Sequence, residues 1–246
     1  MAGRQTHVDV YRPVVWVVGA SRGIGREIAR QFAIIGCRVC LSGRNAGELA
    51  AAVQQIETLG GRGYAFPCDV SDERIATATV KKIVKRIGRV DVLVNSAGVT
   101  VFKSFLHTSS QEFHDVVATN LQGYIHCMKA VLPTMARRKR GWVINILSTA
   151  AVKTFKGSAA YTASKAGMHG LSKVVREEMR PFNVRIVDVF PGPTDTPMWS
   201  PATRRTHSRR MMKAKSVAEA VVALYQFPPD VVPEEIVLRP VGGDLE

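Results

Sequence analysis

The sequence predicts an α/β fold in which helices cover both faces of a doubly wound parallel sheet of about seven strands. Short apolar runs recur along the chain, and stretches with helical spacing separate them. The run Val14–Val18 is apolar throughout, as expected of a strand that is buried on both faces. Regular alternation of strands and helices is typical of a parallel sheet. Because no linker or repeat interrupts it, we expect residues 1–246 to form a single domain.

The first helix is predicted at residues 23–35 from the spacing of Ile24, Ile28, Phe32 and Ile35. The same reasoning predicts strands at residues 38–42, 63–67, 90–94, 142–147, 184–190 and 235–239. It predicts the remaining helices at residues 48–59, 71–87, 109–138, 159–182 and 216–226.

Two of these helices carry local signals. Ser71 or Asp72 is expected to cap the helix at residues 71–87, because both side chains accept hydrogen bonds from free backbone amides. The helical stretch at residues 109–138 is expected to bend near residues 121–123, where it contains Gly123.

The chain is strongly basic, with a formal net charge of +14 from 34 Lys and Arg against 20 Asp and Glu. This balance favours a polyanionic or acidic partner, or it reflects a generally basic surface, and both interpretations remain open. Much of the charge lies at residues 137–140 and 204–215. The first cluster closes a predicted helix, where cations complement the helix dipole. A nucleic-acid patch is the alternative interpretation of that cluster.

The cysteines are interpreted as buried free thiols, which fit a reducing compartment. Cys37 and Cys40 have C-x-x-C spacing, but Cys40 lies in a predicted strand, and positions three apart on a strand face opposite sides. Cys68 and Cys127 form no second pair. Nor is there a metal-binding pattern around His107, His114, His126 and His169, so we expect no metal.

The sequence also predicts a location. No apolar stretch approaches the ~20 residues that a bilayer-spanning helix needs. Residues 1–12 are polar and lack the apolar core of a signal peptide. We therefore expect a cytoplasmic protein without a membrane partner, and we regard nucleic acid as an unlikely one.

A glycine-rich turn, Gly19-Ala20-Ser21-Arg22-Gly23-Ile24-Gly25, joins the first strand to the first helix. Glycines at such a turn let the backbone approach a pyrophosphate at the positive end of the helix, as in Rossmann-type folds. A plain tight turn is the alternative, since the spacing is G-x-x-x-G-x-G rather than G-x-G-x-x-G. The position after the first buried strand favours a nucleotide.

The end of the second strand indicates which nucleotide. An acid there would bond the adenosine ribose of NAD, whereas this chain has Ser42-Gly43-Arg44-Asn45. Arg44 offers a planar guanidinium that can pair with a phosphate, and Arg22 offers a second cation. The sequence therefore predicts NADP(H) rather than NAD(H), although two ordinary surface arginines are the alternative.

Tyr161 and Lys165 lie four residues apart near the start of a predicted helix, on one face. The pKa of a free tyrosine is about 10, and a nearby ammonium lowers it. The pair is therefore able to exchange a proton with a substrate oxygen. Tyr and Lys at this spacing are common by chance, so the pair alone is a weak signal and has to be weighed together with the other motifs of the chain.

With these landmarks together, the chain resembles the short-chain dehydrogenase/reductase family from Val14 to about Arg239. Besides the glycine turn, Asp69-Val70 follows the third strand, and Asn95-Ser96-Ala97-Gly98 is similar to the family's N-N-A-G motif with Ser96 replacing the second Asn. Ser148 lies 13 residues before Tyr161, as in the family. Further landmarks in family order are Asn120 and the segment Pro191, Gly192, Thr194 and Thr196.

The resemblance implies an NADP-dependent oxidoreductase that acts on CH–OH groups and their carbonyl counterparts. Ser148 would position the carbonyl oxygen and Tyr161 would protonate it. Lys165 would hold the nicotinamide ribose and lower the tyrosine pKa, and Asn120 would anchor a water for proton supply. The implied cofactor-binding residues are Gly19, Ser21, Arg22, Gly23, Ile24, Gly25, Arg44, Asp69, Val70, Asn95, Ala97, Gly98, Tyr161, Lys165, Pro191, Gly192, Thr194 and Thr196.

The substrate is less well defined. Residues 194–215 are expected to form a lid over it, either a solvated basic lid or one that attracts an anionic substrate or carrier-protein surface. The tail Glu235-Ile236-Val237-Leu238-Arg239-Pro240 is similar to 3-hydroxy acid dehydrogenase-like members, which favours a ketone or aldehyde over the alternative of a 3-oxoacyl thioester. A non-catalytic NADP-sensing or RNA-binding protein is the rival of another class.

The family resemblance also implies self-association. We expect a homodimer or homotetramer formed through the helices at residues 109–138 and 159–182.

Overall fold

The computed structural model describes residues 12–245, and its centre is a seven-stranded sheet. The order is β3-β2-β1-β4-β5-β6-β9, and every neighbouring pair is parallel. This confirms the predicted Rossmann-type, doubly wound sheet of about seven strands. The strands are β1 Val14–Val18, β2 Arg38–Ser42, β3 Arg62–Ala65, β4 Val92–Asn95, β5 Gly141–Ile146, β6 Val184–Pro191 and β9 Glu235–Leu238.

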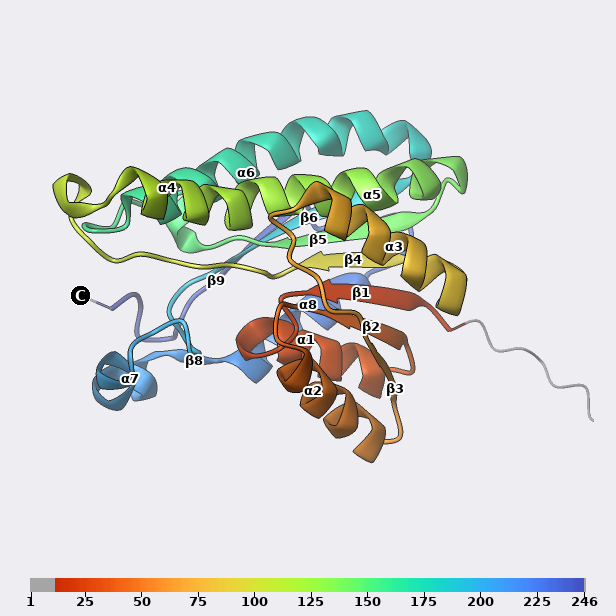
Figure 1. Cartoon of the computed structure of the whole chain (residues 1–246), viewed down its shortest axis with the longest axis horizontal. Coiled ribbons are helices and arrows are strands. Elements are labelled where there is room, and N and C mark those ends of the chain that lie inside the picture. Colours follow the sequence, from red (N-terminus) through yellow and green to blue (C-terminus); the bar gives the residue numbers. More distant parts are fainter. Residues whose placement is uncertain (1–11, 246) are drawn as a thin grey trace, which may run out of the picture.

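Helices cover both faces of this sheet (Figure 1). On one face lie α3 (Glu73–Ile87), α5 (Gly123–Arg137) and α6 (Ala159–Met179), and on the other lie α1 (Gly23–Ile34), α2 (Ala46–Thr58) and α8 (Ala214–Tyr225).

Two apolar cores result, because successive residues of a strand point to opposite faces. In β1, Trp16 packs into the core under α3, α5 and α6, whereas Val15 and Val17 pack into the core under α1, α2 and α8. The cysteines follow the same rule, with Cys40 in the first core and Cys37 in the second.

Capping side chains determine where two helices begin. Asp72 caps α3 by accepting hydrogen bonds from the amides of Arg74 and Ile75, which decides between the two expected caps. Asn45 caps α2 by accepting one from the amide of Glu48, so this helix begins at Ala46, two residues before the predicted start.

The long helical stretch bends where expected. It divides into α4 (Ser110–Val117), a π-helical turn (Ala118–Gln122) and α5, so the irregular turn reaches the predicted bend region. A π-helical turn inserts an extra residue into the helix and is frequent at functional sites.

Residues 194–215 form a separate projection beside the sheet (Figure 1). It contains a small two-stranded sheet of β7 (Thr194–Asp195) and β8 (Met212–Lys213), with α7 (Pro201–His207) between them. None of these three elements was predicted from the sequence.

The parallel sheet has two distinct edges. At the carboxyl edge the strands end and the following helices begin, and at the amino edge the preceding helices end and the strands begin. Among residues 12–245, no helix is long and apolar enough to cross a membrane. The signal-peptide prediction concerns residues that lie almost entirely outside the described range.

Candidate active site

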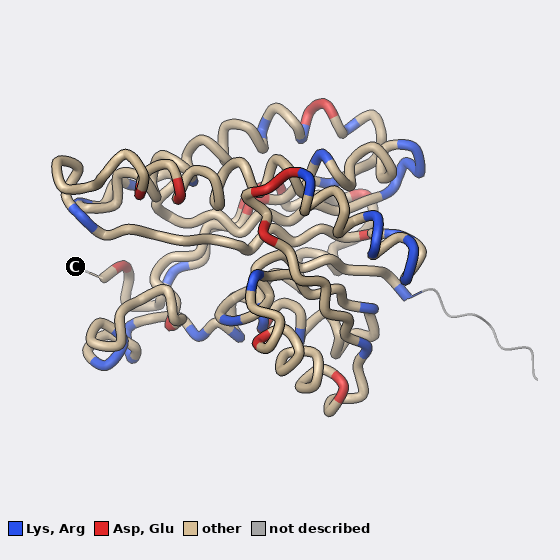
Figure 2. Tube along the Cα trace, viewed as in Figure 1, with Lys and Arg blue, Asp and Glu red and all other residues tan. Residues whose placement is uncertain are grey.

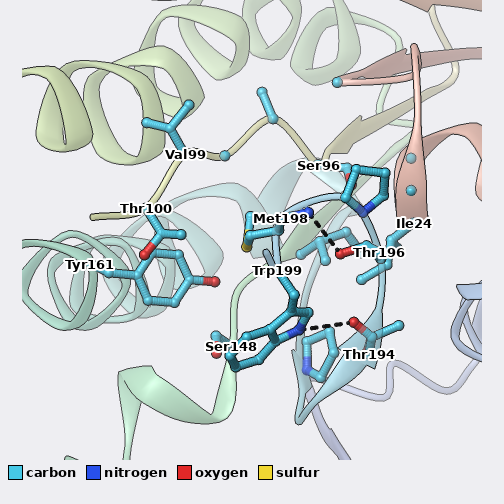
Figure 3. A pocket seen from close by; sticks show the side chains of 18 of the residues that line it. Ile24, Ser96, Val99, Thr100, Ser148, Tyr161, Thr194, Thr196, Met198 and Trp199 are labelled. Carbon is cyan, nitrogen blue, oxygen red and sulfur yellow. Dashed lines mark hydrogen bonds between the residues drawn. The ribbon is translucent and has the colours of Figure 1, made fainter. Parts of the chain in front are cut away.

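A cavity of about 660 Å³ opens at the carboxyl edge, where β1, β4, β5 and β6 end (Figure 3). Most of the residues predicted from the sequence line it. They are Gly19, Ser21, Arg22, Gly23, Ile24, Gly25, Arg44, Asp69, Val70, Ala97, Gly98, Ser148, Tyr161, Lys165, Pro191, Gly192, Thr194 and Thr196.

The glycine turn is shaped by close backbone contacts. Gly19 has a φ of +78°, and a Cβ there would lie 2.5 Å from the amide nitrogen of Ala97. A Cβ on Gly25 would lie 2.3 Å from the carbonyl oxygen of Gly19. Both distances are too short for any side chain, so the turn brings its backbone to the cavity wall because these positions are glycine.

Helix α1 begins at this turn with its amides unoccupied by side chains. Within the described residues, no side chain caps α1 and no acidic residue lies in its first turn. Gly23, Ile24 and Gly25 of that first turn line the cavity. A helix start with free amides and a positive dipole end is a site for an anion such as a phosphate.

Asn95 and Asn120, which were predicted as site residues, are fully buried and absent from the cavity lining. Asn95 donates a hydrogen bond to Asn145 at 2.9 Å, from one strand to the next within the sheet. Asn145 in turn donates to Ser172 and to Asp188. Asn95 therefore stabilises the carboxyl edge of the sheet without lining the cavity.

Asn120 lies in the π-helical turn and holds the chain segment that follows β4. Its side-chain amide donates to the carbonyl oxygen of Val99 at 2.9 Å and to Ser164 Oγ at 3.1 Å. Its side-chain oxygen accepts from the amide of Val99 at 2.9 Å. Through these bonds Asn120 ties a wall of the cavity to α6, next to Lys165.

Ser148 and Tyr161 meet inside the cavity. A hydrogen bond from Ser148 favours the phenolate of Tyr161, but burial has the larger effect and raises the tyrosine pKa. Ser148 Oγ also accepts a hydrogen bond from the amide of Ala150 at 3.1 Å. Because this amide occupies the Ser148 oxygen, the single hydroxyl proton of Ser148 goes either to Tyr161 or, in its place, to another acceptor in the cavity.

Lys165 is buried, and burial lowers its pKa to about 7. Its ammonium donates hydrogen bonds to the carbonyl oxygen of Ile146 at 2.8 Å and to the hydroxyl of Tyr124 at 3.2 Å. It lies 5.9 Å from the centre of the Tyr161 ring. That Lys165 lowers the pKa of Tyr161 stays a prediction.

Sequence reasoning missed Tyr124, which is fully buried beside Lys165. Its hydroxyl donates a hydrogen bond to the carbonyl oxygen of Ile146 at 3.0 Å and accepts the one from Lys165. The available signal was its position four residues after Asn120, which places the two about one helical turn apart.

The projection formed by residues 194–215 closes one side of the cavity with aromatic surface (Figure 3). Trp199 stacks on Phe102 with ring centres 5.4 Å apart and planes 11° apart. The indole nitrogen of Trp199 donates to the carbonyl oxygen of Thr194 at 3.1 Å. This stack joins the projection to the segment after β4.

The end of the described chain reaches the cavity as well. A turn in which the amide of Gly243 donates to the carbonyl oxygen of Pro240 at 2.9 Å reverses the chain after β9. Asp244 then accepts a hydrogen bond from Lys153 at 2.9 Å, and Leu245 lines the cavity. The sequence did not predict this contact.

His169 lies beside two carboxylates in an arrangement that could resemble a metal site. His169, Asp188 and Glu235 have potential ligand atoms within 4.8 Å of one another. Asp188 already accepts hydrogen bonds from Ser172, Asn145 and Arg176. His169 shares a hydrogen bond with Glu235. Because the Arg176 guanidinium lies within this group, the carboxylates there serve an ion-pair network.

The cysteines of the described residues are all buried and free, as predicted. Burial raises the pKa of Cys37 to about 11 and that of Cys40 to about 12. These thiols therefore lack the thiolate character of a redox pair.

Known proteins share this architecture. Residues 13–207 match the short chain dehydrogenase family. The chain is 35% identical over 240 residues to sepiapterin reductase of Chlorobaculum tepidum, covering 95% of this chain and 98% of that one. It is 37% identical over 177 residues to the 3-oxoacyl-[acyl-carrier-protein] reductase of Staphylococcus aureus, covering 72% of each.

A solved structure agrees with these relatives. The alcohol dehydrogenase of the archaeon Thermococcus sibiricus, complexed with 5-hydroxy-NADP, superposes with a TM-score of 0.88 at 29% identity, covering 96% of this chain and all of that one. The fold, the family match and these relatives together lead to one conclusion: the chain belongs to the short-chain dehydrogenase family of oxidoreductases.

Proposed function

We propose that this protein is an NADP(H)-dependent carbonyl reductase, which interconverts a ketone or aldehyde and the corresponding alcohol. The observation that carries this proposal is the meeting of Ser148, Tyr161 and Lys165 in one cavity with the glycine turn. A protein that only binds a nucleotide does not need the hydroxyls of Ser148 and Tyr161 beside Lys165. This set of residues therefore favours catalysis over the non-catalytic alternative.

The cavity fits a dinucleotide that carries an extra phosphate. The first turn of α1 offers free amides for a pyrophosphate. Arg22 and Arg44 line the same cavity, and their guanidinium groups suit a phosphate. Asp69, which lines it too, has one oxygen engaged by the amide and hydroxyl of Ser71. These residues support NADP(H) as the cofactor.

When bound, the nicotinamide supplies or accepts the hydride. Tyr161 gives its proton to the carbonyl oxygen as that oxygen gains negative charge. Ser148 donates its hydroxyl proton to the same oxygen in place of Tyr161, so two hydroxyls stabilise the developing charge.

Lys165 has one N–H donor beyond those that bond to the protein. An ammonium has three donors, and two of them go to Ile146 and Tyr124. The third remains for an acceptor in the cavity, for which a ribose hydroxyl is suited. Tyr124 and the Ile146 carbonyl thus act as positioning groups that aim Lys165.

The aromatic stack supports a substrate with an apolar group beside its carbonyl. Phe102, Trp199 and Phe155 line the cavity, and Trp199 comes from the projection that we propose to be the lid. Apolar and aromatic linings with a few placed polar groups are typical of small-molecule sites.

A 3-oxoacyl thioester is the second candidate substrate. The relative from Staphylococcus aureus is named for such a substrate, and Arg205, Arg209 and Arg210 of the lid are exposed. If these cations attract an acidic carrier, kcat/KM will fall steeply with added salt, because exposed charges are screened. A flat salt response would leave the lid as a solvated surface.

The test is the variant Tyr161→Phe, assayed with NADPH and a panel of ketones, aldehydes and an acetoacetyl thioester. A lost proton donor is expected to lower kcat by about 10²- to 10⁴-fold. Calorimetry should find the NADPH affinity largely unchanged. Tyr64→Phe is the matched control, because Tyr64 lies in β3 and its ring faces Arg86. Full activity of Tyr161→Phe, or no turnover of any carbonyl by the unaltered protein, would contradict the proposal.

A further inference from the structure

The amino edge of the sheet carries an arginine within three residues of the start of each of six strands. In sheet order these are Arg62, Arg38, Arg12, Arg89, Arg140 and Arg185. The strand register places them together, since Arg38 pairs with both Val14 and Arg62, and Trp142 pairs with Arg185. Neighbouring strands lie about 4.8 Å apart, so the arginines form a row across one edge.

The segments that enter β1 to β5 hold most of this charge. We call them the basic edge, defined as residues 12–14, 34–38, 57–62, 84–92 and 137–141. All of these residues are described, and their acidic side chains are Glu57 and Asp91. Their basic side chains are Arg12, Arg38, Arg62, Lys85, Arg86, Arg89, Arg137, Arg138, Lys139 and Arg140.

The acids neutralise little of this charge. Asp91 pairs with Arg89 and Arg138, while eight of the ten basic residues are exposed. Figure 2 shows Lys and Arg gathered where α3 and α5 end and where β1 begins, at the end of the molecule away from the C-terminus.

Helix dipoles do not account for the row. Lys85, Arg86 and Arg137 lie in the last turns of α3 and α5, where cations complement the dipole. Arg38 and Arg62, however, are the first residues of strands, which have no comparable dipole.

Exposed aliphatic side chains lie among these cations. Ile34 and Leu59 are each 52% exposed, and Ile35 and Val84 are each 39% exposed, all within the basic edge. Ile34, Ile35 and Leu59 lie at the ends of α1 and α2, directly before Arg38 and Arg62. These side chains add apolar surface to a region that is otherwise rich in cations.

We propose that the basic edge docks on an anionic lipid surface. Arginine and lysine bind phosphate headgroups, and aliphatic side chains between them enter the boundary between headgroups and acyl chains. Single-stranded nucleic acid favours aromatic platforms for base stacking, whereas the exposed apolar residues of these segments are aliphatic. The proposed contact is peripheral, since among residues 12–245 no helix is long and apolar enough to cross a membrane.

This docking also orients the enzyme. The cavity opens at the carboxyl edge, at the opposite end of the strands from the basic edge. A protein bound through its basic edge therefore keeps its cavity open to solvent.

The experiment is sedimentation with vesicles of phosphatidylcholine alone or with about a third phosphatidylglycerol. The edge variant Lys85→Glu/Arg137→Glu/Lys139→Glu reverses three exposed charges. The lid variant Arg205→Glu/Arg209→Glu/Arg210→Glu changes the net charge equally at the other end of the molecule. NADPH binding of the edge variant should match that of the unaltered protein, because the substitutions are remote from the cavity. Its thermal unfolding should remain cooperative at a slightly lower temperature, since Lys85 and Arg137 complement the dipoles of α3 and α5.

We expect binding to the anionic vesicles alone, a loss of at least tenfold in the edge variant, and less than threefold in the lid variant. Binding should also weaken in Ile34→Ser/Leu59→Ser, which keeps the charge. Equal losses in both charge variants would reduce the effect to net charge and overturn the proposal. So would absence of binding to anionic vesicles, or tighter binding of a single-stranded RNA that the edge variant loses.

Discussion

The two edges of the parallel sheet are built from the same strands and helices, yet they differ in chemistry. At the carboxyl edge the helices begin, and the free amides of α1 face a cavity lined by glycines and hydroxyls. At the amino edge the helices end, and cations gather at their ends. Because aligned peptide dipoles make a helix start positive and its end negative, one edge suits a bound anion and the other collects cations of the protein itself. Substitutions paired across the edges test this difference.

The largest effect is expected for Gly25→Ala at the carboxyl edge. Its Cβ would lie 2.3 Å from the Gly19 carbonyl oxygen, so the turn must open. We expect NADPH affinity to fall by more than about 100-fold, equivalent to about 2.7 kcal/mol. Calorimetric titration measures it.

The paired substitution is Gly36→Ala at the amino edge. Gly36 has a φ of +86°, and within the described structure its Cβ would meet nothing within 4 Å. Strain should lower the free energy of unfolding by about 1–2 kcal/mol and leave NADPH binding unchanged. Similar NADPH affinities for the two variants would remove the distinction between the edges.

The second effect concerns the pH dependence of stability. Burial lowers the pKa of Lys165 to about 7 in the folded protein. Between that value and about 10.4 the lysine is more protonated in the unfolded chain than in the folded one, so its contribution to stability rises with pH. Without cofactor, this contribution to the free energy of unfolding should rise by about 2 kcal/mol between pH ~7 and ~9. The buried cysteines, whose pKa values are raised, act in the opposite direction over the same range, so the contribution of Lys165 has to be measured as a difference between variants.

Denaturant unfolding at several pH values checks this. The difference in free energy of unfolding between the unaltered protein and Lys165→Met should grow by about 2 kcal/mol from pH ~7 to ~9. The corresponding difference for Lys139→Met at the basic edge, where the lysine is exposed, should not change with pH. A difference for Lys165→Met that stays constant with pH would contradict the lowered pKa of Lys165.

The third effect is on cofactor choice. Arg44→Ala removes a cation from the cavity, and charge-assisted hydrogen bonds contribute about 1.5–3 kcal/mol. We expect kcat/KM for NADPH to fall at least about tenfold while that for NADH stays constant. Arg62→Ala, an exposed arginine at the basic edge, should change neither value. Higher kcat/KM with NADH than with NADPH in the unaltered enzyme would refute the NADP assignment.

The smallest effect is expected at the chain end. Asp244→Asn weakens its pairs with Lys153 and Arg239, whose side chains are about half exposed. Such pairs contribute about 0–1 kcal/mol, so the substrate KM should change about two- to threefold, with an unchanged KM for NADPH. Asp230→Asn, an exposed residue at the amino edge, is the control. If only the KM for NADPH changed, the chain end would contact the cofactor and not the substrate.

The sheet was predictable because its strands are continuous apolar runs, as in Val14–Val18, and because Gly and Asp residues mark the turns. The position of the bend in residues 109–138 was predictable. Its π-helical form was not, because it depends on long-range hydrogen bonds such as those from Asn120 to Val99 and Ser164. Local patterns do not encode bonds between residues so far apart in sequence.

The residues of the candidate site that were predictable are those whose spacing resembles the family pattern, with Ser148 after β5 and Tyr161 and Lys165 four residues apart on α6. Tyr124 escaped notice because a buried tyrosine on a helix has the same pattern as a core residue. The contacts of Trp199 with Phe102 and of Asp244 with Lys153 join segments that only the fold brings together.

The Phe102–Trp199 stack has an optical consequence. The chain has three tryptophans, and Trp16 and Trp142 are buried in the two cores, away from the cavity lining. Trp199 lies on the cavity wall and is held there by one ring contact and one hydrogen bond. Of the three tryptophans, Trp199 is therefore the one whose ultraviolet emission should respond to movement of the projection, so intrinsic fluorescence can test on ligand binding whether the projection acts as a lid.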